Sequence, residues 1–217
     1  MGASVPKVLL PLIAGGDSIL QQTVRCFERD PACGQIVLCV PVEWESRFSQ
    51  EVREFGKVMI VHGGGTRQES VSRGAEALAA CIRPDEQSMP VLVHDAARAC
   101  VTPQVVARVL AGIAAHGAVT AAVQVVDSLC RAESGVVATY VDRAHLWAIQ
   151  TPQGFVLQDL LAAHRHAAEG GIEALDDAAL VARLRPVHVV EGDRLNIKVT
   201  QPGDLAIAEM ISEKREK

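Results

Sequence analysis

Residues 91–98 read Val-Leu-Val-His-Asp-Ala-Ala-Arg, an apolar run that ends in charged residues. A continuous run of aliphatic and β-branched residues predicts a parallel strand that is covered on both faces. Thr102 and Pro103 follow, and a threonine cap with a proline at the first helical position predicts a helix over 103–116. Strand, charged turn and helix in this order predict an open α/β sheet with the charged turn at its carboxyl edge.

The same alternation extends along the chain in both directions. Further apolar runs predict strands at 36–40, 58–61, 118–125 and 187–190. Longer amphipathic stretches predict helices at 18–28, 67–81, 157–169, 176–184 and 201–217. The pattern predicts one domain over 1–217, built as a doubly wound, mostly parallel α/β sheet.

One polar segment, about 127–150, interrupts this alternation with two short β-like pieces around 133–135. A two-stranded ribbon is only marginally stable by itself. We therefore expect a protruding β-arm that packs against a second subunit.

Composition narrows the choice of function. The 217 residues are 49% hydrophobic and carry a net charge of -5, without the basic stripe that a nucleic-acid partner requires. No apolar run reaches the length of a membrane span, and the start of the chain does not resemble a signal peptide. The six cysteines have no zinc-ligand spacing, so we expect reduced, mostly buried thiols in a cytoplasmic protein.

Four segments contain residues suited to a ligand site. In 63–70, three glycines would let the backbone approach a ligand and the helix start would offer free N–H groups to an anion or a base edge, or the segment could form only a flexible strand-to-helix turn. In 94–98, Asp95 could hold Mg²⁺ and Arg98 could grip a phosphate, or the two could form a structural pair. In 196–205, Lys198 could bind a phosphate or remain a surface lysine. In 142–155, Arg143 could reach an anion, while the aromatic residues could simply anchor the arm.

The order of these segments along the chain is more specific than any one of them. Pro6-Lys7 comes first, followed by 63–70, 94–98, Asp127-Ser128, 142–155, Asp176-Asp177 and 196–205. Over nearly the whole chain this series resembles the 2-C-methyl-D-erythritol 4-phosphate cytidylyltransferase family of the non-mevalonate isoprenoid pathway. The resemblance implies a Rossmann-like nucleotidyltransferase fold with a β-arm that is exchanged across a homodimer. It also implies transfer of CMP from CTP to the sugar-alcohol phosphate, with release of pyrophosphate.

Carried over residue by residue, the resemblance assigns two groups of side chains. For the nucleotide, Lys7 would stabilise charge at the α-phosphate, Asp95 would hold Mg²⁺, and Gly64 and Ser70 would contact the cytosine and ribose.

For the phosphate groups and the second substrate, the resemblance implies four further residues. Arg98 and Lys198 would handle phosphate groups, and Lys198 would also act in catalysis. Ser128 and Arg143, on the arm, would bind methylerythritol phosphate in the site of the neighbouring subunit. The attacking group is already an anion, so positive charge and positioning should dominate the catalysis.

The chain departs from the family pattern at several positions. It has Ala99 where proline is usual and Leu175 where threonine is usual, while Ser128 keeps the hydroxyl of the usual threonine. Family members open with a strand and a glycine-rich loop, and Met1-Gly2 matches the last two residues of that loop. From this match we expect a natural start roughly 20–25 residues upstream, the length of one strand and a loop. A chain without that first strand should bind CTP weakly and be marginally stable.

Two other functions fit the same segments. A ribitol 5-phosphate cytidylyltransferase would keep the chemistry and change the alcohol. A non-catalytic, dimeric binding protein would keep the fold without the nucleotide loop.

Overall fold

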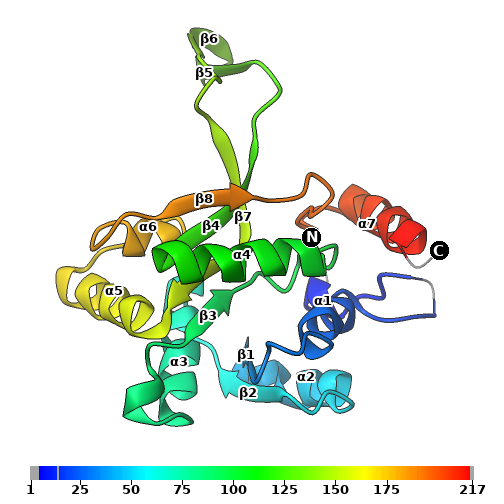
Figure 1. The fold of residues 1–217 in the computed structure, drawn as a ribbon. Helices are drawn as coiled ribbons and strands as arrows, with labels where there is room; N and C mark the ends of the chain where they lie inside the picture. Colours follow the sequence, from blue (N-terminus) through cyan, green and yellow to red (C-terminus); the bar gives the residue numbers. More distant parts are fainter. Residues whose placement is uncertain (1–4, 14, 216–217) are drawn as a thin grey trace.

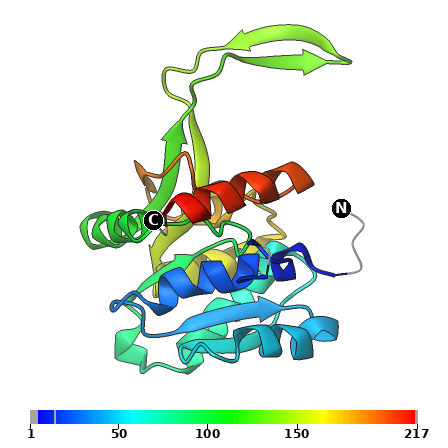
Figure 2. The ribbon, with the colours of Figure 1, turned by 90° about the vertical axis from the view of Figure 1, so that its right-hand side faces the viewer.

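The computed structural model describes residues 5–13 and 15–215. Helices surround the sheets of an α/β fold, and a thin arm projects from one side in both views (Figures 1 and 2). The strands are β1 Ile36–Val40, β2 Val58–His62, β3 Pro90–Val93, β4 Ala118–Gln124, β5 Leu129–Glu133, β6 Val136–Val141, β7 Trp147–Val156 and β8 His188–Glu191. The α-helices are α1 Ile19–Glu28, α2 Glu45–Val52, α3 Arg67–Ala80, α4 Pro103–His116, α5 Leu157–Gly170, α6 Asp177–Val181 and α7 Pro202–Arg215.

The main sheet has four strands in the order β3-β7-β4-β8. Strands β4 and β8 are parallel, whereas β7 runs antiparallel to both of its neighbours. The predicted strands and the mostly parallel α/β fold are confirmed. Strand β7 was missed because its centre is polar: Gln150, Thr151 and Gln153 are buried there, and their side chains form hydrogen bonds with neighbouring segments.

Strands β1 and β2 form a separate parallel pair. In the part of the chain that the structure describes, β1 pairs only with β2 and β3 pairs only with β7, so each has one edge without a hydrogen-bonded strand. Four of the five residues of β1 are accordingly only half-buried. The predicted family match at Met1-Gly2 lies outside the described residues.

Side chains cap the starts of α1, α3 and α4, including the predicted cap Thr102. Ser18 caps α1 in a reciprocal arrangement with Gln21, and Thr66 and Thr102 accept hydrogen bonds from the first turns of α3 and α4. Helix α2 was not predicted, because only Phe48 and Val52 of its eight residues are buried and the apolar signal is correspondingly weak.

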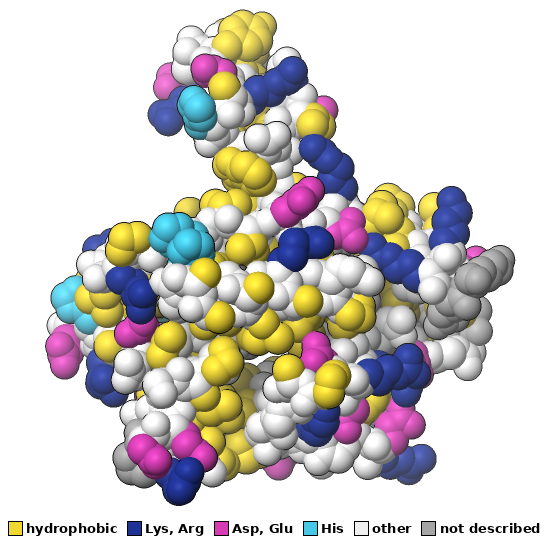
Figure 3. All heavy atoms as spheres, viewed as in Figure 1, with side chains coloured by type: hydrophobic (Ala, Val, Ile, Leu, Met, Phe, Trp, Pro, Cys, Tyr) yellow, Lys and Arg dark blue, Asp and Glu magenta, His cyan; other side chains and the backbone are white. Residues whose placement is uncertain are grey.

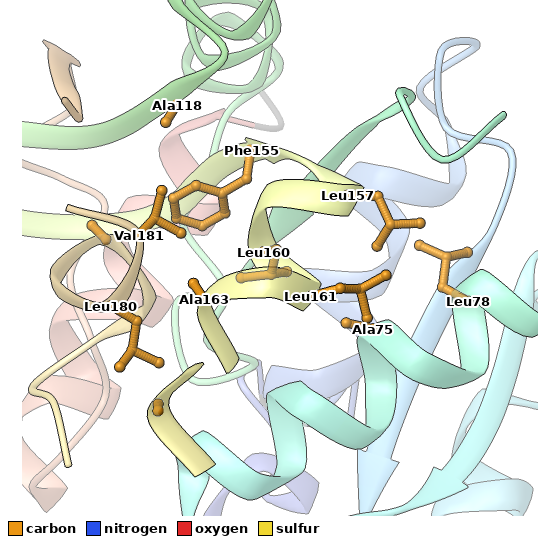
Figure 4. Packing of buried hydrophobic residues seen from close by; sticks show 12 residues of the cluster. Ala75, Leu78, Ala118, Phe155, Leu157, Leu160, Leu161, Ala163, Leu180 and Val181 are labelled. Carbon is orange, nitrogen blue, oxygen red and sulfur yellow. The ribbon is translucent and has the colours of Figure 1, made fainter. Parts of the chain in front are cut away.

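The main hydrophobic core lies between the four-stranded sheet and helices α3, α5 and α6 (Figure 4). Phe155 of β7 is fully buried there and packs with leucines of α5 and α6. A second core, under α1 and α2, contains Leu20, Val24 and Phe48. The main core holds β3 through Val91 and Val93 and α3 through Ala75 and Leu78, and the candidate site is built at the ends of these two elements.

The arm consists of β5 and β6, which pair antiparallel across a turn at Ser134 and Gly135. The predicted segment, 127–150, contains both strands, but its last residues already belong to β7, which enters the sheet from Trp147 onward. Hydrophobic and charged side chains are mixed on the arm surface (Figure 3). No helix within the described residues is long and apolar enough to cross a lipid bilayer.

Candidate active site at the carboxyl edge of β3

Asp95 lies two residues beyond the end of β3 and is the centre of a charged cluster. Its backbone N–H donates to Thr151 Oγ1 of β7 at 3.0 Å, which fixes the turn against the neighbouring strand. Its carboxylate accepts from Lys198 Nζ at 2.8 Å and from Arg67 Nε at 3.1 Å. The Asp95 side chain is 14% exposed. The structure therefore brings together Asp95 and Lys198, which the sequence placed in the same site.

Two cations decide the charge state of Asp95. Burial alone would raise the pKa of its carboxyl group, but the hydrogen bond from Lys198 and the positive charge of Arg67 outweigh burial and lower the pKa. The group is therefore ionised throughout the neutral pH range, as a cation ligand must be.

Arg67, the first residue of α3, connects this cluster to the interior. Its Nη1 donates to Asp177 Oδ2 at 2.8 Å, while its Nε faces Asp95. Burial would lower the pKa of Arg67, but the charges of Asp177 and Asp95 more than compensate and raise it. Arg67 belongs to the segment 63–70, but sequence analysis assigned it no role.

Arg98 closes the same turn, with its backbone N–H donating to the Asp95 carbonyl at 2.9 Å. Its Nη1 donates to the Asn196 carbonyl at 2.8 Å, and its buried Nε has no hydrogen-bond partner among the described residues. Burial lowers the pKa of Arg98, and the nearby Asp95 charge only partly opposes this. Arg98 is thus a largely buried cation on the turn that carries Asp95, and a guanidinium can bind phosphate oxygens through its N–H groups.

Two backbone amides of the glycine-rich loop are bound within the chain. The Gly64 N–H donates to Ser70 Oγ at 3.0 Å, and the Gly65 N–H donates to Glu69 Oε2 at 2.7 Å. The chain's own side chains thus satisfy both groups. Glycine is required at 64 for a steric reason instead, because an added Cβ would lie 2.2 Å from Glu69 Cβ.

Three predicted residues are not joined to this cluster within the chain. Lys7 is half-buried in a short 3-10 helix, Lys7–Leu9, and no hydrogen bond or ion pair in the described residues links it to Asp95. Ser128 and Arg143 are exposed on the arm, where Arg143 donates to the Val126 carbonyl. The structure therefore separates the arm residues from the Asp95 cluster of the same chain.

Lys7 instead lies close enough to Asp204, in the first turn of α7, to affect its ionisation. A hydrogen bond from Thr200 is the main cause of the lowered pKa of Asp204, and the charge of Lys7 contributes. Asp204 also accepts from the backbone N–H of Thr200 and of Gln201, and so holds the loop that carries Lys198 onto α7.

The donor set matches a cation that arrives with its substrate. Among the described residues, no group of three or more His, Cys, Asp or Glu side chains could hold a metal. Asp95 supplies one ionised carboxylate, and Mg²⁺ is commonly bound by one or two carboxylates together with substrate phosphates. The residues present fit Mg²⁺ in that mode.

Sequence reasoning overlooked two buried polar groups that support the site. His164 was assigned no role in the site, and its Nε2 lies 3.0 Å from Asp177 Oδ1 in the interior. Asp177 appeared only as one of two aspartates before a short helix. Asp176 caps that helix and Asp177 points inward. A carboxylate on an otherwise apolar helix was the sequence signal that could have revealed the buried role of Asp177.

Comparison with known proteins is consistent with this geometry. The model of the family IspD, 2-C-methyl-D-erythritol 4-phosphate cytidylyltransferase, matches residues 1–214. The chain belongs to this family. The enzyme of that name from Geobacillus kaustophilus is 40% identical over 215 residues, which cover 97% of this chain and 90% of the relative.

Solved structures of family members agree in fold. The crystal structure of the cytidylyltransferase from Thermus thermophilus is 33% identical, with a TM-score of 0.79 over 97% of this chain and 96% of that one. A structure of 4-diphosphocytidyl-2C-methyl-D-erythritol synthase is also 33% identical, with a TM-score of 0.82 over 91% of each chain. The predicted family, nucleotidyltransferase fold and enzyme class, a cytidylyltransferase, are confirmed.

Proposed function

We propose that the Asp95 cluster carries out the reaction of the family, transfer of CMP from CTP to 2-C-methyl-D-erythritol 4-phosphate. A phosphate oxygen of the sugar alcohol attacks the α-phosphorus, the bond to the β-phosphate oxygen breaks, and pyrophosphate leaves. The observation that supports this most directly is the carboxylate of Asp95 held between Lys198 and Arg67, with Arg98 on the same turn. Family membership favours this function over a ribitol 5-phosphate enzyme or a non-catalytic dimer.

The chain's own cations handle the charge of the reaction. Lys198 Nζ is bound to Asp95, and its side chain is 41% exposed, so it can turn toward a phosphate without leaving a buried pocket. Arg98 supplies a further cation on the turn that carries Asp95. Lys7 at the α-phosphate, and Gly64 and Ser70 at the base and ribose, complete the assignment by resemblance. Bringing together two anions is the main barrier, and fixed positive charge lowers it.

Mg²⁺ is the proposed cofactor, with Asp95 as its protein ligand. When bound, it would neutralise the charge of the triphosphate and favour the departure of pyrophosphate.

We further propose a homodimer in which the arm completes the site of the partner. Ser128 and Arg143 lie on the arm, apart from the Asp95 cluster of their own chain, so they can bind the sugar phosphate only at another subunit. The arm also exposes apolar side chains, including Val136 and Tyr140, the latter 78% exposed. Exposed apolar surface of this kind is characteristic of an interface.

One experiment tests the reaction, with CTP, Mg²⁺ and either methylerythritol phosphate or ribitol 5-phosphate, following pyrophosphate release. We expect turnover with methylerythritol phosphate and none with ribitol 5-phosphate. Turnover only with ribitol 5-phosphate, or with neither substrate, would overturn the proposal.

A complementation experiment tests the shared site. Asp95→Asn removes the carboxylate of the site, and Arg143→Ala removes the arm residue that would complete the partner's site. Each variant alone should therefore be nearly inactive. After random subunit exchange, mixed dimers with one intact site should restore about a quarter of wild-type activity. No recovery in proven mixed dimers, or a monomer at micromolar concentration in sedimentation, would contradict the shared site.

The cytoplasmic location remains a prediction. It is supported by the cysteines, all six of which are free thiols.

A further inference from the structure

A buried acid–histidine pair lies behind the Asp95 cluster. His164 of α5 and Asp177 of α6 meet with Nε2 and Oδ1 3.0 Å apart, and their side chains are 3% and 1% exposed. A carboxylate only accepts hydrogen bonds, so this geometry assigns the Nε2 proton to His164 as the donor. The other oxygen of Asp177, Oδ2, accepts from Arg67 Nη1 at 2.8 Å. Both oxygens of the buried carboxylate are therefore occupied by oriented donors.

Arg67 is held at two positions on its guanidinium group. Nη1 is bound to the buried Asp177 and Nε to Asp95, whose other oxygen is bound to Lys198. The result is a continuous chain of contacts, His164–Asp177–Arg67–Asp95, which runs from the core to the carboxylate of the site. The Arg67 side chain is 38% exposed, so the Asp177 end is what restricts its otherwise flexible stem.

We propose that His164 and Asp177 are positioning residues, which fix Arg67 so that it orients the Asp95 carboxylate for cation and phosphate binding. The inference rests on the proposed function of the Asp95 cluster. A guanidinium is planar, so fixing one edge also fixes the direction of the remaining donors. Loss of His164 leaves one Asp177 oxygen without its donor, the carboxylate can rotate, and Arg67 then loses its defined orientation.

The first test follows the Arg67 Nε–H group directly by NMR in the full-length protein. Its resonance is identified by its loss in Arg67→Lys, and hydrogen bonding to Asp95 should slow its exchange with water. In His164→Phe we expect this exchange to become at least about tenfold faster, because the hydrogen bond is no longer held.

The chain supplies matched controls for this measurement. Arg25 Nε donates to Asp17 at 2.8 Å in a comparable ion pair remote from α5, so its signal should not change. His166 is exposed on the same helix, and His166→Phe should leave the Arg67 signal as in the wild type.

Two conservative variants separate positioning from folding. In His164→Gln the side-chain amide can still donate to Asp177. The exchange rate of the Arg67 Nε–H group should therefore return toward the wild-type value. In Asp177→Asn the shape of the side chain is kept but its charge is lost. The Arg67 Nε–H group should therefore exchange with water faster than in the wild type while the protein stays folded. If His164→Phe does not fold, the Arg67 Nε–H exchange rates of His164→Gln and Asp177→Asn are compared instead. An unchanged Arg67 signal in a folded His164→Phe or Asp177→Asn protein would overturn the proposal.

A double-mutant cycle gives the catalytic readout. His164→Phe should lower kcat about tenfold with little change in KM for CTP, while His164→Gln should recover most of the loss. In an Arg67→Lys background the same His164→Phe change should have little further effect, because the two residues act in series. Full additivity of the two losses would contradict positioning through Arg67.

The two proposals fail in different ways. A wild-type protein that does not turn over CTP would reject the proposed function and leave the Arg67 signal measurable. An active wild-type protein whose Arg67 signal ignores His164 and Asp177 would reject only the positioning role.

Discussion

Lys198 Nζ lies 2.8 Å from Asp95 Oδ2, so the lysine that the family resemblance assigns to phosphate is bound to the carboxylate assigned to Mg²⁺. Each group neutralises the other. A cation bound to Asp95 and an anion bound to Lys198 would replace this one ion pair with two, one at each residue. The two ligands should therefore favour each other's binding.

Replacing Lys198 or Arg143 with alanine should affect the sugar phosphate more than the nucleotide. We expect the apparent KM for methylerythritol phosphate to rise about tenfold or more, with CTP affinity changed less, because charge-assisted contacts to that phosphate are lost. Steady-state kinetics with each substrate varied in turn measure both values. Lys214→Ala, exposed near the end of α7, is the control. Normal apparent affinity for the sugar phosphate in both variants would refute the assignment.

The pH dependence of stability should report the pairing of Asp95. Folding lowers the pKa of this carboxyl below its ordinary value of 3.8. The contribution to stability is therefore fully present above the unfolded-state value and is lost as the pH falls through the lower, folded-state value. Urea unfolding of the wild type and of Asp95→Asn should show a stability difference that is constant near neutral pH and changes below about pH 4. Asp85→Asn, at an exposed surface position, is the control, and a difference that keeps one value down to pH 2 would disprove the pairing.

The glycine loop should tolerate substitution at 64 poorly. Gly64→Ala would place a methyl group 2.2 Å from Glu69 Cβ, and we expect a loss of about 1–3 kcal/mol in unfolding free energy as the loop shifts. The same shift should break the Gly64–Ser70 hydrogen bond. Gly34→Ala is the matched control, because an added Cβ there meets no atom within 4 Å. Equal stability of the two variants in thermal unfolding would show that the loop is not tightly constrained.

Hydrogen exchange should distinguish the two sheets. Strands β1 and β2 pair only with each other among the described strands, whereas β4 and β7 are in the interior of the four-stranded sheet. We expect the amides of β1 and β2 to exchange sooner, because this pair can open without breaking the main sheet. Exchange mass spectrometry of peptides from the two regions measures the difference. Equal protection would mean that the two sheets open together.

Most of the fold could be predicted because its signals are local. The runs at 36–40 and 118–125 have the β-branched composition of buried strands, and Thr102-Pro103 marks a helix start with two residues. Strand β7 could not be predicted in the same way, since Gln150 and Gln153 look solvent-exposed in sequence. Their burial depends on partners such as Asp193 and Thr120, which are distant in the chain.

The residues of the candidate site also fall into two groups, those with a local sequence signal and those without one. Asp95 and Lys198 could be predicted because each follows or adjoins an apolar segment and carries a charge that needs a partner. Arg67 and His164 could not, because their roles arise from contacts with Asp177 that join three helices. The amides of Gly64 and Gly65 are not free for a ligand in this structure, because Ser70 and Glu69 fold back one turn to bind them.

The hydrogen bond from Arg143 to the Val126 carbonyl has a consequence for assembly kinetics. It ties together the two segments that enter and leave the arm, so in the proposed homodimer the arm would reach the partner subunit already shaped rather than as two loose segments. Less conformational entropy is then lost on association, and the encounter of two subunits can proceed as docking of preformed surfaces. This bond uses Nη1 of Arg143, so the remaining N–H donors of the guanidinium would be free to bind the phosphate of the proposed substrate. The arm of the proposed homodimer would therefore keep its preformed root whether or not substrate is bound.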